Sequence, residues 1–442
     1  GKELLSVSLD AGNDFSVQVT PEHPFFVLRN GNFLQIRADQ LQSDDYIATP
    51  KKYSIVGQAH NFFADLKKLD LDVSVSPQIA KSLLYSKCTT IKTAMEQFRI
   101  KRNYCKFTSH LKKGFLHIAL VDEDALSEGF LKIKLRKSRK WINFPRYLHP
   151  ELAEFIGYVV GDGHVTSNSI QIFTADAEMI SRVQELSWSL FSLKTSVLKD
   201  PRSKASRISV ISNTLAELVT TIFGISQGKK GPQLVIPTWL MTAPDNVIAR
   251  FLRAYFDCDG SVCKTYRNIE ITSESKPLVQ QVHVLLQRFG IFSCISLKKV
   301  NSKPYWKLSI EARYAELFAD TIGSLLKRKQ ERLSEFSRMG KNQGCGKQDM
   351  IPLGSLLKNL RTSLGFSIGE IQDEVLSYGI YEKNGRISRE SLAKLYDFYY
   401  RKKHGDMTNI LGLFTEQKNP YQYYSRGKAN AVLYYFSAIN LL

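Results

Sequence analysis

The sequence predicts an α+β protein in which one module of about 100 residues occurs twice. Three ordered matches carry this prediction, at offsets of 97, 98 and 99 residues. They pair GYVVGDG (157–163) with AYFDCDG (254–260), FTADAEMI (173–180) with ITSESKPL (271–278), and ISVISNTLAEL (208–218) with KLSIEARYAEL (307–317). Each copy reads as helix, two strands, helix, strands, helix. Short alternating strands before the repeat and helical patterns after it complete the α+β assignment.

Composition limits the class of protein. The 442 residues are 43% hydrophobic, which excludes general disorder, and they carry 61 Lys and Arg against 42 Asp and Glu, a net charge of +19. That excess predicts a polyanionic partner, nucleic acid before a membrane. There is no apolar run long enough to span a membrane, and the six cysteines form no CxxC pair. We therefore expect an intracellular, cytoplasmic protein with reduced thiols.

The chain divides into six segments on sequence grounds. FSVQV, FFVLR and FLQIR predict short strands, KSLLYSKCTTIKTAMEQF (81–98) has helical spacing, and three helical patterns follow a polar Gly-containing stretch. The expected segments are a β-rich one (1–52), a basic mixed α/β DNA-recognition or linker region (53–145), repeat 1 (146–243), repeat 2 (244–336), a linker (337–350) and a helical domain (351–442).

The first helix of each repeat has small residues four apart. Gly157 and Gly161 in repeat 1 correspond to Ala254 and Cys258 in repeat 2. Small residues at i and i+4 lie on one helix face and let two helix backbones approach closely. We expect the two helices to pack along these faces around a pseudo-twofold axis.

Both helices then end in Asp-Gly, at Asp162 and Asp259. If the helices pack as expected, the two carboxylates converge next to a basic surface. Oxygen ligands of this kind suit Mg²⁺ or Mn²⁺, which also binds substrate phosphates and can assist phosphodiester hydrolysis. The alternative is that each Asp-Gly only terminates a core helix. The repetition of the small-residue stripe in register favours the metal site.

The doubled motif resembles that of the LAGLIDADG (dodecapeptide) homing endonucleases in their single-chain, pseudo-dimeric form. The resemblance covers about 146–335. It implies αββαββα repeats whose antiparallel sheets form a saddle over double-stranded DNA, and a monomer that cuts both strands. It also implies that Asp162 and Asp259 bind the catalytic divalent metal, with the preceding residues, Gly161 and Cys258, in the same site.

The same family places a basic residue near the cleavage centre of each half. Lys329 lies in LLKRKQERL, and this setting resembles that of the family's lysine in the second half. The 99-residue offset between the repeats then points to Lys230 in the first half. A solvated Lys-rich turn is the alternative. One departure is that family members within proteins often carry this lysine three residues before an Ile-Pro proline, where this chain has Leu234. Lys229 or Lys230 could substitute for it.

The amino-terminal segment resembles block B of inteins, the self-splicing Hint fold. The resemblance rests on VTPEHPFFVLRNGNFLQIRADQLQSDDYIATP, and it implies that Thr20 and His23 polarise the first scissile peptide bond. A satisfied core histidine is the alternative for His23. Inteins commonly carry an inserted LAGLIDADG nuclease, so the expected partners are double-stranded DNA and a host protein in cis.

Two parts of a splicing element are not in this sequence. Gly1 is not the Cys or Ser nucleophile that opens most inteins, and Asn440 is followed by two leucines rather than ending a His-Asn pair. We therefore expect an internal fragment of an intein, which cannot splice by the usual chemistry as written.

Two further regions are candidates for DNA contact. One is the basic run before repeat 1, where phosphate neutralisation would add affinity: Lys132, Lys134, Arg136, Lys137, Arg139 and Lys140. The other is a helix-turn-helix-like pattern whose groove-facing helix would begin near Ser388, with Arg386 and Arg389 at its amino end. A solvated charged face and a small helical bundle are the respective alternatives.

The preferred function is Mg²⁺-dependent, site-specific cleavage of double-stranded DNA by an intein-encoded endonuclease. One alternative is a non-cleaving DNA-binding or maturase-like derivative, which Leu234 motivates. The other is a protein-splicing element whose nuclease is vestigial.

Overall fold

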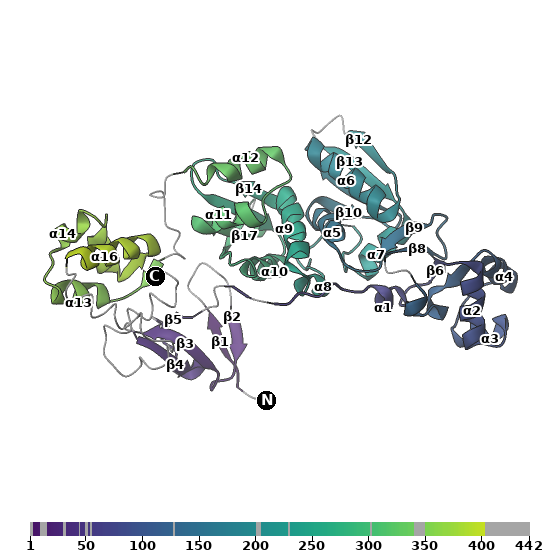
Figure 1. The fold of residues 1–442 in the computed structure, drawn as a ribbon, viewed down its shortest axis with the longest axis horizontal. Helices are drawn as coiled ribbons and strands as arrows, with labels where there is room; N and C mark the ends of the chain where they lie inside the picture. Colours follow the sequence, from purple (N-terminus) through teal and green to yellow (C-terminus); the bar gives the residue numbers. More distant parts are fainter. Residues whose placement is uncertain are drawn as a thin grey trace. The chain divides into compact units, whose positions relative to one another are not determined.

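The computed structural model divides into two compact units, which are described separately (Figure 1). Unit 1 comprises residues 1–51 and 341–442, and unit 2 comprises 52–340. The structure describes residues 3–8, 16–29, 32–43, 45–48, 52–53, 55–126, 129–199, 205–228, 230–300, 303–339 and 350–402. Within these ranges, no helix combines the length and apolar character that crossing a bilayer requires.

Unit 2 contains the two repeats, each in the predicted αββαββα order. The first comprises α5 (Pro150–Asp162), β10 (Gly163–Val165), β11 (Ser169–Thr174), α6 (Ala177–Phe191), β12 (Thr195–Lys199), β13 (Ser206–Ile211) and α7 (Asn213–Thr221). After α8 (Thr238–Met241), the second comprises α9 (Asp245–Asp259), β14 (Gly260–Val262), β15 (Asn268–Ser273), α10 (Lys276–Gln287), β16 (Cys294–Val300), β17 (Lys303–Glu311) and α11 (Arg313–Thr321). Helix α12 (Lys327–Glu335) follows.

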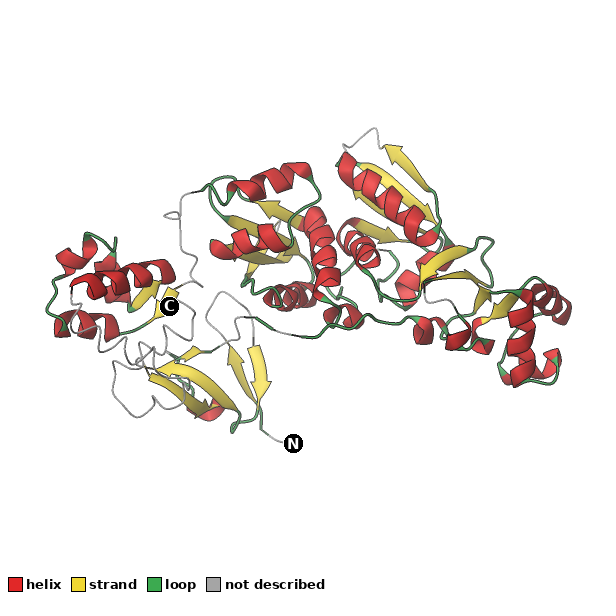
Figure 2. Ribbon diagram, viewed as in Figure 1, coloured by secondary structure: helices red, strands yellow, loops and turns green. Residues whose placement is uncertain are grey.

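Each repeat forms a four-stranded antiparallel sheet with the same strand order. The orders are β10-β11-β13-β12 and β14-β15-β17-β16. Helices pack against these sheets (Figure 2), and the strand residues alternate accordingly. In β11, Ile170 and Ile172 are fully buried while Phe173 is exposed. The period-2 pattern of the sequence therefore becomes a sheet with one face in the core.

A smaller α/β module precedes the repeats in unit 2. It comprises α1 (Phe63–Leu66), β6 (Leu71–Ser74), α2 (Pro77–Lys87), α3 (Ile91–Gln97), α4 (Tyr104–Lys112), β7 (Phe115–His117), β8 (Phe130–Leu135) and β9 (Ile142–Pro145). Its antiparallel sheet has the order β7-β6-β8-β9. The module is joined to repeat 1 by hydrogen bonds from the Leu135 amide to Thr214 Oγ1 (3.2 Å) and from Asn143 to Ser192 (2.8 Å).

Unit 1 contains the β-rich amino-terminal segment and a carboxyl-terminal α/β bundle. The strands are β1 (Leu5–Ser8), β2 (Ser16–Val19), β3 (Pro24–Arg29), β4 (Asn32–Arg37) and β5 (Tyr46–Ile47). The bundle comprises β18 (Met350–Pro352), α13 (Leu356–Ser363), α14 (Ile368–Gln372), α15 (Tyr378–Asn384), β19 (Arg386–Ser388) and α16 (Arg389–Lys402). Its core includes Tyr378, Phe398 and Tyr399, which are buried together.

The structure differs from the sequence prediction for this region in two respects. A two-stranded sheet of β18 and β19 is part of it, so Arg386 lies in a strand rather than at the amino end of a helix. The expected linker, 337–350, ends one residue too late because Met350 already pairs in β18, and 340–349 lie outside the described residues. Residues 403–442, including Asn440, also lie outside the described part.

Candidate active site

The first helices of the two repeats, α5 and α9, pack together along their small residues. A Cβ atom added at Gly157 would lie 2.7 Å from the Cβ of Ala254 and 2.7 Å from the carbonyl oxygen of Phe251. One added at Gly161 would lie closer still to the Cβ of Cys258. These separations are shorter than real Cβ contacts, so only glycine fits at either position in α5. The prediction that the helices dock along this stripe is confirmed.

Asp162 and Asp259 are the last residues of these helices and are half-buried. Burial raises the pKa of Asp162, against the lowering effects of the Cys258 thiol, Lys230 and Lys329. Burial, together with the negative charge of Asp162, raises the pKa of Asp259 to about 6. Each carboxylate therefore senses the other half of the site, as expected where two like charges converge.

A lysine binds the carboxyl end of each helix. Lys230 Nζ donates to the carbonyl oxygens of Val159 (3.2 Å) and Val160 (2.8 Å), and also to that of Gly161. The terminal carbonyls of a helix carry partial negative charge and have no partner within the helix, so an ammonium group satisfies both needs.

The second lysine repeats this arrangement on α9. Lys329 Nζ donates to the carbonyl oxygens of Phe256 (2.8 Å), Asp257 (2.8 Å) and Gly260 (2.6 Å). Burial lowers the pKa of both lysines, which remain beside the two aspartates. The structure thus brings together the two carboxylates and two lysines that the sequence singled out, in two equivalent halves.

The donor set fits a hard divalent cation. Two converging carboxylates whose charged forms are disfavoured by burial would be stabilised by a cation between them. Among the described residues, no group of three or more His, Cys, Asp and Glu side chains forms a closed metal cage. Mg²⁺ suits such a site, because it keeps several waters and takes phosphate oxygens as ligands.

The two other residues expected at the metal fit it less well. The carbonyl oxygen of Gly161 accepts the hydrogen bond of Lys230. Burial raises the pKa of the Cys258 thiol well above its ordinary value, which opposes the thiolate form that binds metals. The oxygen donors of the two aspartates therefore remain the principal candidates.

Comparison with known proteins bears on this pair of repeats. Residues 246–323, which span α9 to α11, match the family model described as a LAGLIDADG-like domain. This chain carries a LAGLIDADG homing endonuclease domain. The fold and sequence repeat extend the same architecture to the first half of the domain, which the family match does not cover.

Relatives that match most of the chain are larger proteins with different functions. The probable translation initiation factor IF-2 of Thermococcus kodakarensis is 29% identical over 406 residues, covering 89% of this chain and 32% of the relative. Glutamine–fructose-6-phosphate aminotransferase of Methanocaldococcus jannaschii is 25% identical over 406 residues, covering 84% and 36%. The chain thus spans about a third of the length of these relatives. A segment shared by archaeal proteins that are named as different enzymes and factors is consistent with intein-containing hosts.

A solved structure of the endonuclease I-DmoI, in complex with DNA and calcium, is also similar to this chain. It is 16% identical, covers 42% of this chain and 97% of its own, and superposes with a TM-score of 0.33.

Leu234 occupies the position at which family members often carry a lysine. It takes no part in the polar contacts of the LAGLIDADG centre, which comprises Asp162, Asp259, Lys230 and Lys329. Leu234 is half-buried, and its carbonyl oxygen accepts a hydrogen bond from Ser275 Oγ (2.6 Å). Lys230, on the preceding turn, is the residue that reaches α5. Lys229 lies outside the described residues.

Thr20 and His23 flank the turn between β2 and β3 in unit 1. The His23 amide donates to the carbonyl oxygen of Thr20 (3.0 Å), and the His23 ring packs edge-on against Phe25 at 5.2 Å. Thr20 is half-buried and His23 is exposed, so His23 is not a core histidine.

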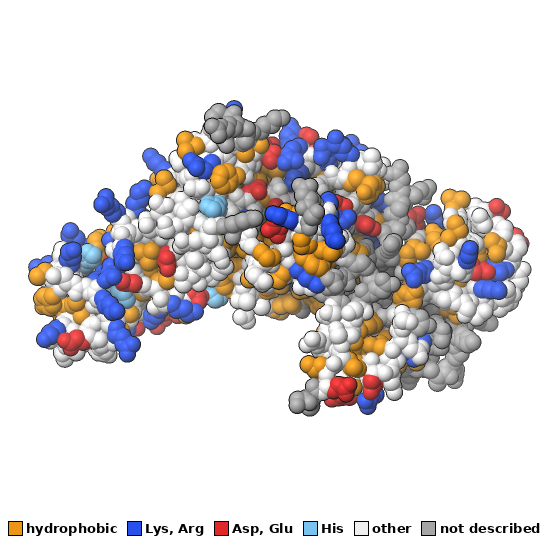
Figure 3. Space-filling model, turned by 180° about the vertical axis from the view of Figure 1, so that it is seen from behind, with side chains coloured by type: hydrophobic (Ala, Val, Ile, Leu, Met, Phe, Trp, Pro, Cys, Tyr) orange, Lys and Arg blue, Asp and Glu red, His pale blue; other side chains and the backbone are white. Residues whose placement is uncertain are grey.

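The basic run before repeat 1 occupies β8 and the turn that follows it. Leu131 and Ile133 are buried, which turns the alternating Lys132 and Lys134 outward. The exposed side chains of the following turn are Arg136, Lys137, Arg139 and Lys140. Arg136 is held by Asp70 (2.8 Å), and Lys134 lies over the ring of Trp141 (5.2 Å). Figure 3 shows Lys and Arg side chains gathered over this end of unit 2.

Of the two arginines predicted at the amino end of a helix in the carboxyl-terminal bundle, Arg389 lies there and Arg386 does not. Arg386 is exposed in β19, and its guanidinium lies 5.6 Å from the ring centre of Tyr46. Arg389 is the first residue of α16.

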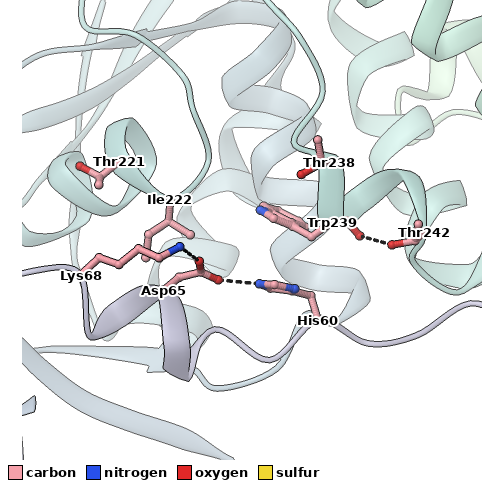
Figure 4. Close-up of a pocket in the computed structure, with 8 residues that line it drawn as sticks. All are labelled: His60, Asp65, Lys68, Thr221, Ile222, Thr238, Trp239 and Thr242. Carbon is pink, nitrogen blue, oxygen red and sulfur yellow. Dashed lines mark hydrogen bonds and ion pairs between the residues drawn. The ribbon is translucent and has the colours of Figure 1, made fainter. Parts of the chain in front are cut away.

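A hollow of about 450 Å³ lies elsewhere in unit 2 (Figure 4). His60, Lys68 and Trp239 are among its lining residues, and none of the predicted site residues is. Its carboxylate, Asp65, is already engaged by His60 Nε2 and Lys68 Nζ, each at 2.7 Å. This hollow is therefore separate from the LAGLIDADG centre and lacks a free acidic group.

Sequence reasoning missed two groups of residues. One is Asp257, a buried acid two positions before Asp259; the doubled acid in FDCDG was the available signal. The other comprises exposed lysines near the outer ends of strands in both four-stranded sheets: Lys199, Lys298, Lys299 and Lys303. The lysines were visible in the sequence, but their place near the ends of strands β12, β16 and β17 was not.

Proposed function

We propose that this chain is a site-specific DNA endonuclease carried within an intein, and that it hydrolyses both strands with Mg²⁺ or Mn²⁺. One observation carries the proposal: two half-buried aspartates end a pair of packed helices, and each helix end is bound by a lysine. A single acid at a helix end would need only a structural explanation. Two equivalent acid–lysine centres match the two phosphodiester bonds of a duplex.

In this proposal Asp162 and Asp259 hold the divalent cation, which supplies electrostatic stabilisation of the charge that develops on phosphate. Because the pKa of Asp259 is raised to about 6, this acid becomes predominantly ionised only as the pH rises above that value. Lys230 and Lys329 keep a positive charge beside each centre, where it opposes the negative charge of the backbone phosphate. Their bonds to helix carbonyls fix both ammonium groups before DNA arrives.

Double-stranded DNA is the proposed partner, bound across the two antiparallel sheets as on a saddle. The exposed lysines Lys199, Lys298, Lys299 and Lys303 support contact with its backbone. The basic turn, with Lys132, Lys134, Arg136, Lys137, Arg139 and Lys140, would extend phosphate contact on the repeat 1 side. Arg386 and Arg389 are weaker candidates, because Arg386 packs on Tyr46.

The splicing role is proposed for unit 1. Thr20 and His23 flank one tight turn, with His23 exposed, so both could reach a peptide bond presented to that turn. The partner in this reaction is the host protein in cis, consistent with relatives that differ in function.

The test is cleavage of DNA that contains the uninterrupted host gene, with Mg²⁺. We expect one defined double-strand cut, and loss of that cut in Asp162→Asn and in Asp259→Asn with DNA binding retained in a gel-shift assay. Asp39→Asn provides the matched control, since that acid pairs with the exposed Arg37 in unit 1 and acts on neither aspartate of the site. Full cleavage by either site variant would contradict the assignment.

The second candidate is a non-cleaving DNA-binding or maturase-like derivative, favoured by Leu234 at the position of the expected lysine. Specific binding by the unaltered protein with no cut under Mg²⁺ or Mn²⁺ would select it. Splicing without either DNA activity would select a splicing element with a vestigial nuclease.

A further inference from the structure

Asp257 is the acid of repeat 2 that has no counterpart in repeat 1. It lies in the last turn of α9, two residues before Asp259, and is 2% exposed. The repeat offset of 97 residues places Val160 at the equivalent position of α5. Val160 is also buried but has no polar group. A buried carboxylate is costly unless hydrogen bonds satisfy it, so its partners indicate why it is there.

Those partners come from the loop between α11 and α12. One carboxylate oxygen of Asp257 accepts a hydrogen bond from Ser324 Oγ, and the other accepts one from the Leu325 amide (3.2 Å). Ser324 Oγ in turn accepts from the Leu326 amide (3.1 Å). The carboxylate and the serine together satisfy the backbone that leads into α12.

Helix α12 carries Lys329 in its first turn. The Lys329 amide bonds to the carbonyl oxygen of Leu326 (2.9 Å), and its side chain returns to the end of α9, where one of its acceptors is the Asp257 carbonyl oxygen (2.8 Å). Lys329 is 4% exposed. Asp257 therefore contacts the loop before α12 and the lysine within α12. Its carboxylate accepts hydrogen bonds from the loop, and its backbone carbonyl oxygen accepts one from Lys329.

We propose that Asp257 is a positioning residue for Lys329, which it keeps against the second aspartate of the LAGLIDADG centre through Ser324 and the start of α12. The consequence for DNA cleavage rests on the proposed function, but the positioning itself does not.

Repeat 1 lacks this device. Lys230 lies in a non-helical segment and is half-buried, and Val160 offers it a carbonyl but no side-chain anchor. The two halves of the centre are therefore unequal: the lysine of repeat 2 is held by a buried network, whereas that of repeat 1 is held by its own three hydrogen bonds. We expect the strand served by repeat 2 to depend on Asp257.

The first experiment needs no nuclease activity. The full chain is treated with an amine-acylating reagent, and modification of each lysine is followed by mass spectrometry. In Asp257→Asn and in Ser324→Ala, Lys329 should be acylated about tenfold faster or more, because a hydrogen bond to a charged group is lost. Lys230 should react at an unchanged rate in the same sample. Ser334→Ala, which removes an exposed hydroxyl from the same helix, is the matched control.

Unchanged acylation of Lys329 in both variants overturns the proposal, whatever the protein does to DNA. Equal increases at Lys329 and Lys230 also overturn it, because they would indicate general loosening of the fold.

The second experiment measures nicking of each DNA strand by the same variants. Asp257→Asn should slow one strand about tenfold relative to the other, and Lys329→Met should slow that same strand. In the Lys329→Met background, Asp257→Asn should add no further loss, because the residue it positions is gone. Additive losses, or equal slowing of both strands, would show that Asp257 does not act through Lys329. If the unaltered protein cuts no DNA, the proposed function fails and the acylation result alone decides the positioning.

Discussion

At the scale of single residues, the paired acids are under opposing influences. Burial favours the protonated form of both acids, and the charge of Asp162 adds to this effect at Asp259, while Lys230 and Lys329 favour the charged forms. The outcome for Asp259 is a pKa of about 6. Acids of this kind are poised to exchange a proton for a metal ion near neutral pH.

This raised pKa predicts how stability without metal depends on pH. Unfolded Asp titrates near 3.9, so between about pH 4 and 6 the native state binds more protons than the unfolded state. The contribution of Asp259 is therefore present at low pH and is lost as pH rises through 6. We expect its loss to cost on the order of 1–2 kcal/mol, allowing for solvent access.

Thermal unfolding in a chelating buffer at pH 4.5 and pH 7.5 measures this effect. The unaltered protein should lose more stability over that range than Asp259→Asn, which has no proton to release. Mg²⁺ should restore stability at pH 7.5 in the unaltered protein only. Parallel pH profiles for the two proteins would contradict the raised pKa.

The residues of the centre differ in how far the sequence could predict them. The aspartates follow from the doubled motif, and Lys230 from the repeat offset, because equivalent modules place equivalent residues alike. The bond from Ser324 to Asp257 joins residues 67 positions apart, and no periodicity connects them.

At the scale of elements, the contact between α5 and α9 determines the geometry of the site. Glycines remove the side chains that would separate the two backbones, and the helices end side by side. Such a close interface tolerates little added volume.

Gly157→Val should therefore destabilise the protein by about 2 kcal/mol, because its side chain would meet Ala254 and the Phe251 carbonyl. Urea unfolding measures the difference. Gly129→Val is the control, since an added Cβ there has no neighbour within 4 Å. Equal effects at the two positions would show that the helices do not pack along this face.

Elements outside the repeats show where periodicity misleads. Residues 81–98 have continuous helical spacing, yet α2 ends at Lys87 and α3 begins at Ile91. Thr90 caps α3 by accepting a hydrogen bond from the Thr93 amide, and that local bond starts a new helix. Similarly, Arg386 lies in β19 because its neighbour Ile387 pairs with Ile351, a contact that helical spacing cannot predict.

At the scale of the whole molecule, the chain is organised as one continuous unit between two parts of another. Unit 2 runs from 52 to 340, while unit 1 combines the amino-terminal strands with the carboxyl-terminal bundle. Such a division is expected where one continuous segment, here unit 2, is inserted into the sequence of a smaller domain, here unit 1. It agrees with the proposal of a nuclease inserted into a splicing domain.

Residues 52–340 expressed alone should therefore fold and bind DNA. The slope of log affinity against log salt should match that of the full chain within about one unit, because the proposed phosphate contacts belong to unit 2. Unfolding curves and binding to random-sequence duplex at several salt concentrations test this. If the slope of the 52–340 fragment is smaller in magnitude by two or more, residues of unit 1, such as Arg386 or Arg389, also contact phosphates.

The repeat, the small-residue stripe, the paired acids and the positive charge could all be read from the chain before it folds, because they are properties of residue type and spacing. Other features required the three-dimensional arrangement. Folding grouped the amino-terminal strands with the bundle of 350–402, placed a strand at Arg386, and connected Asp257 through Ser324 to Lys329. Those outcomes depend on which distant segments form hydrogen bonds and bury surface together. The spacing of residues along the chain does not predict such contacts.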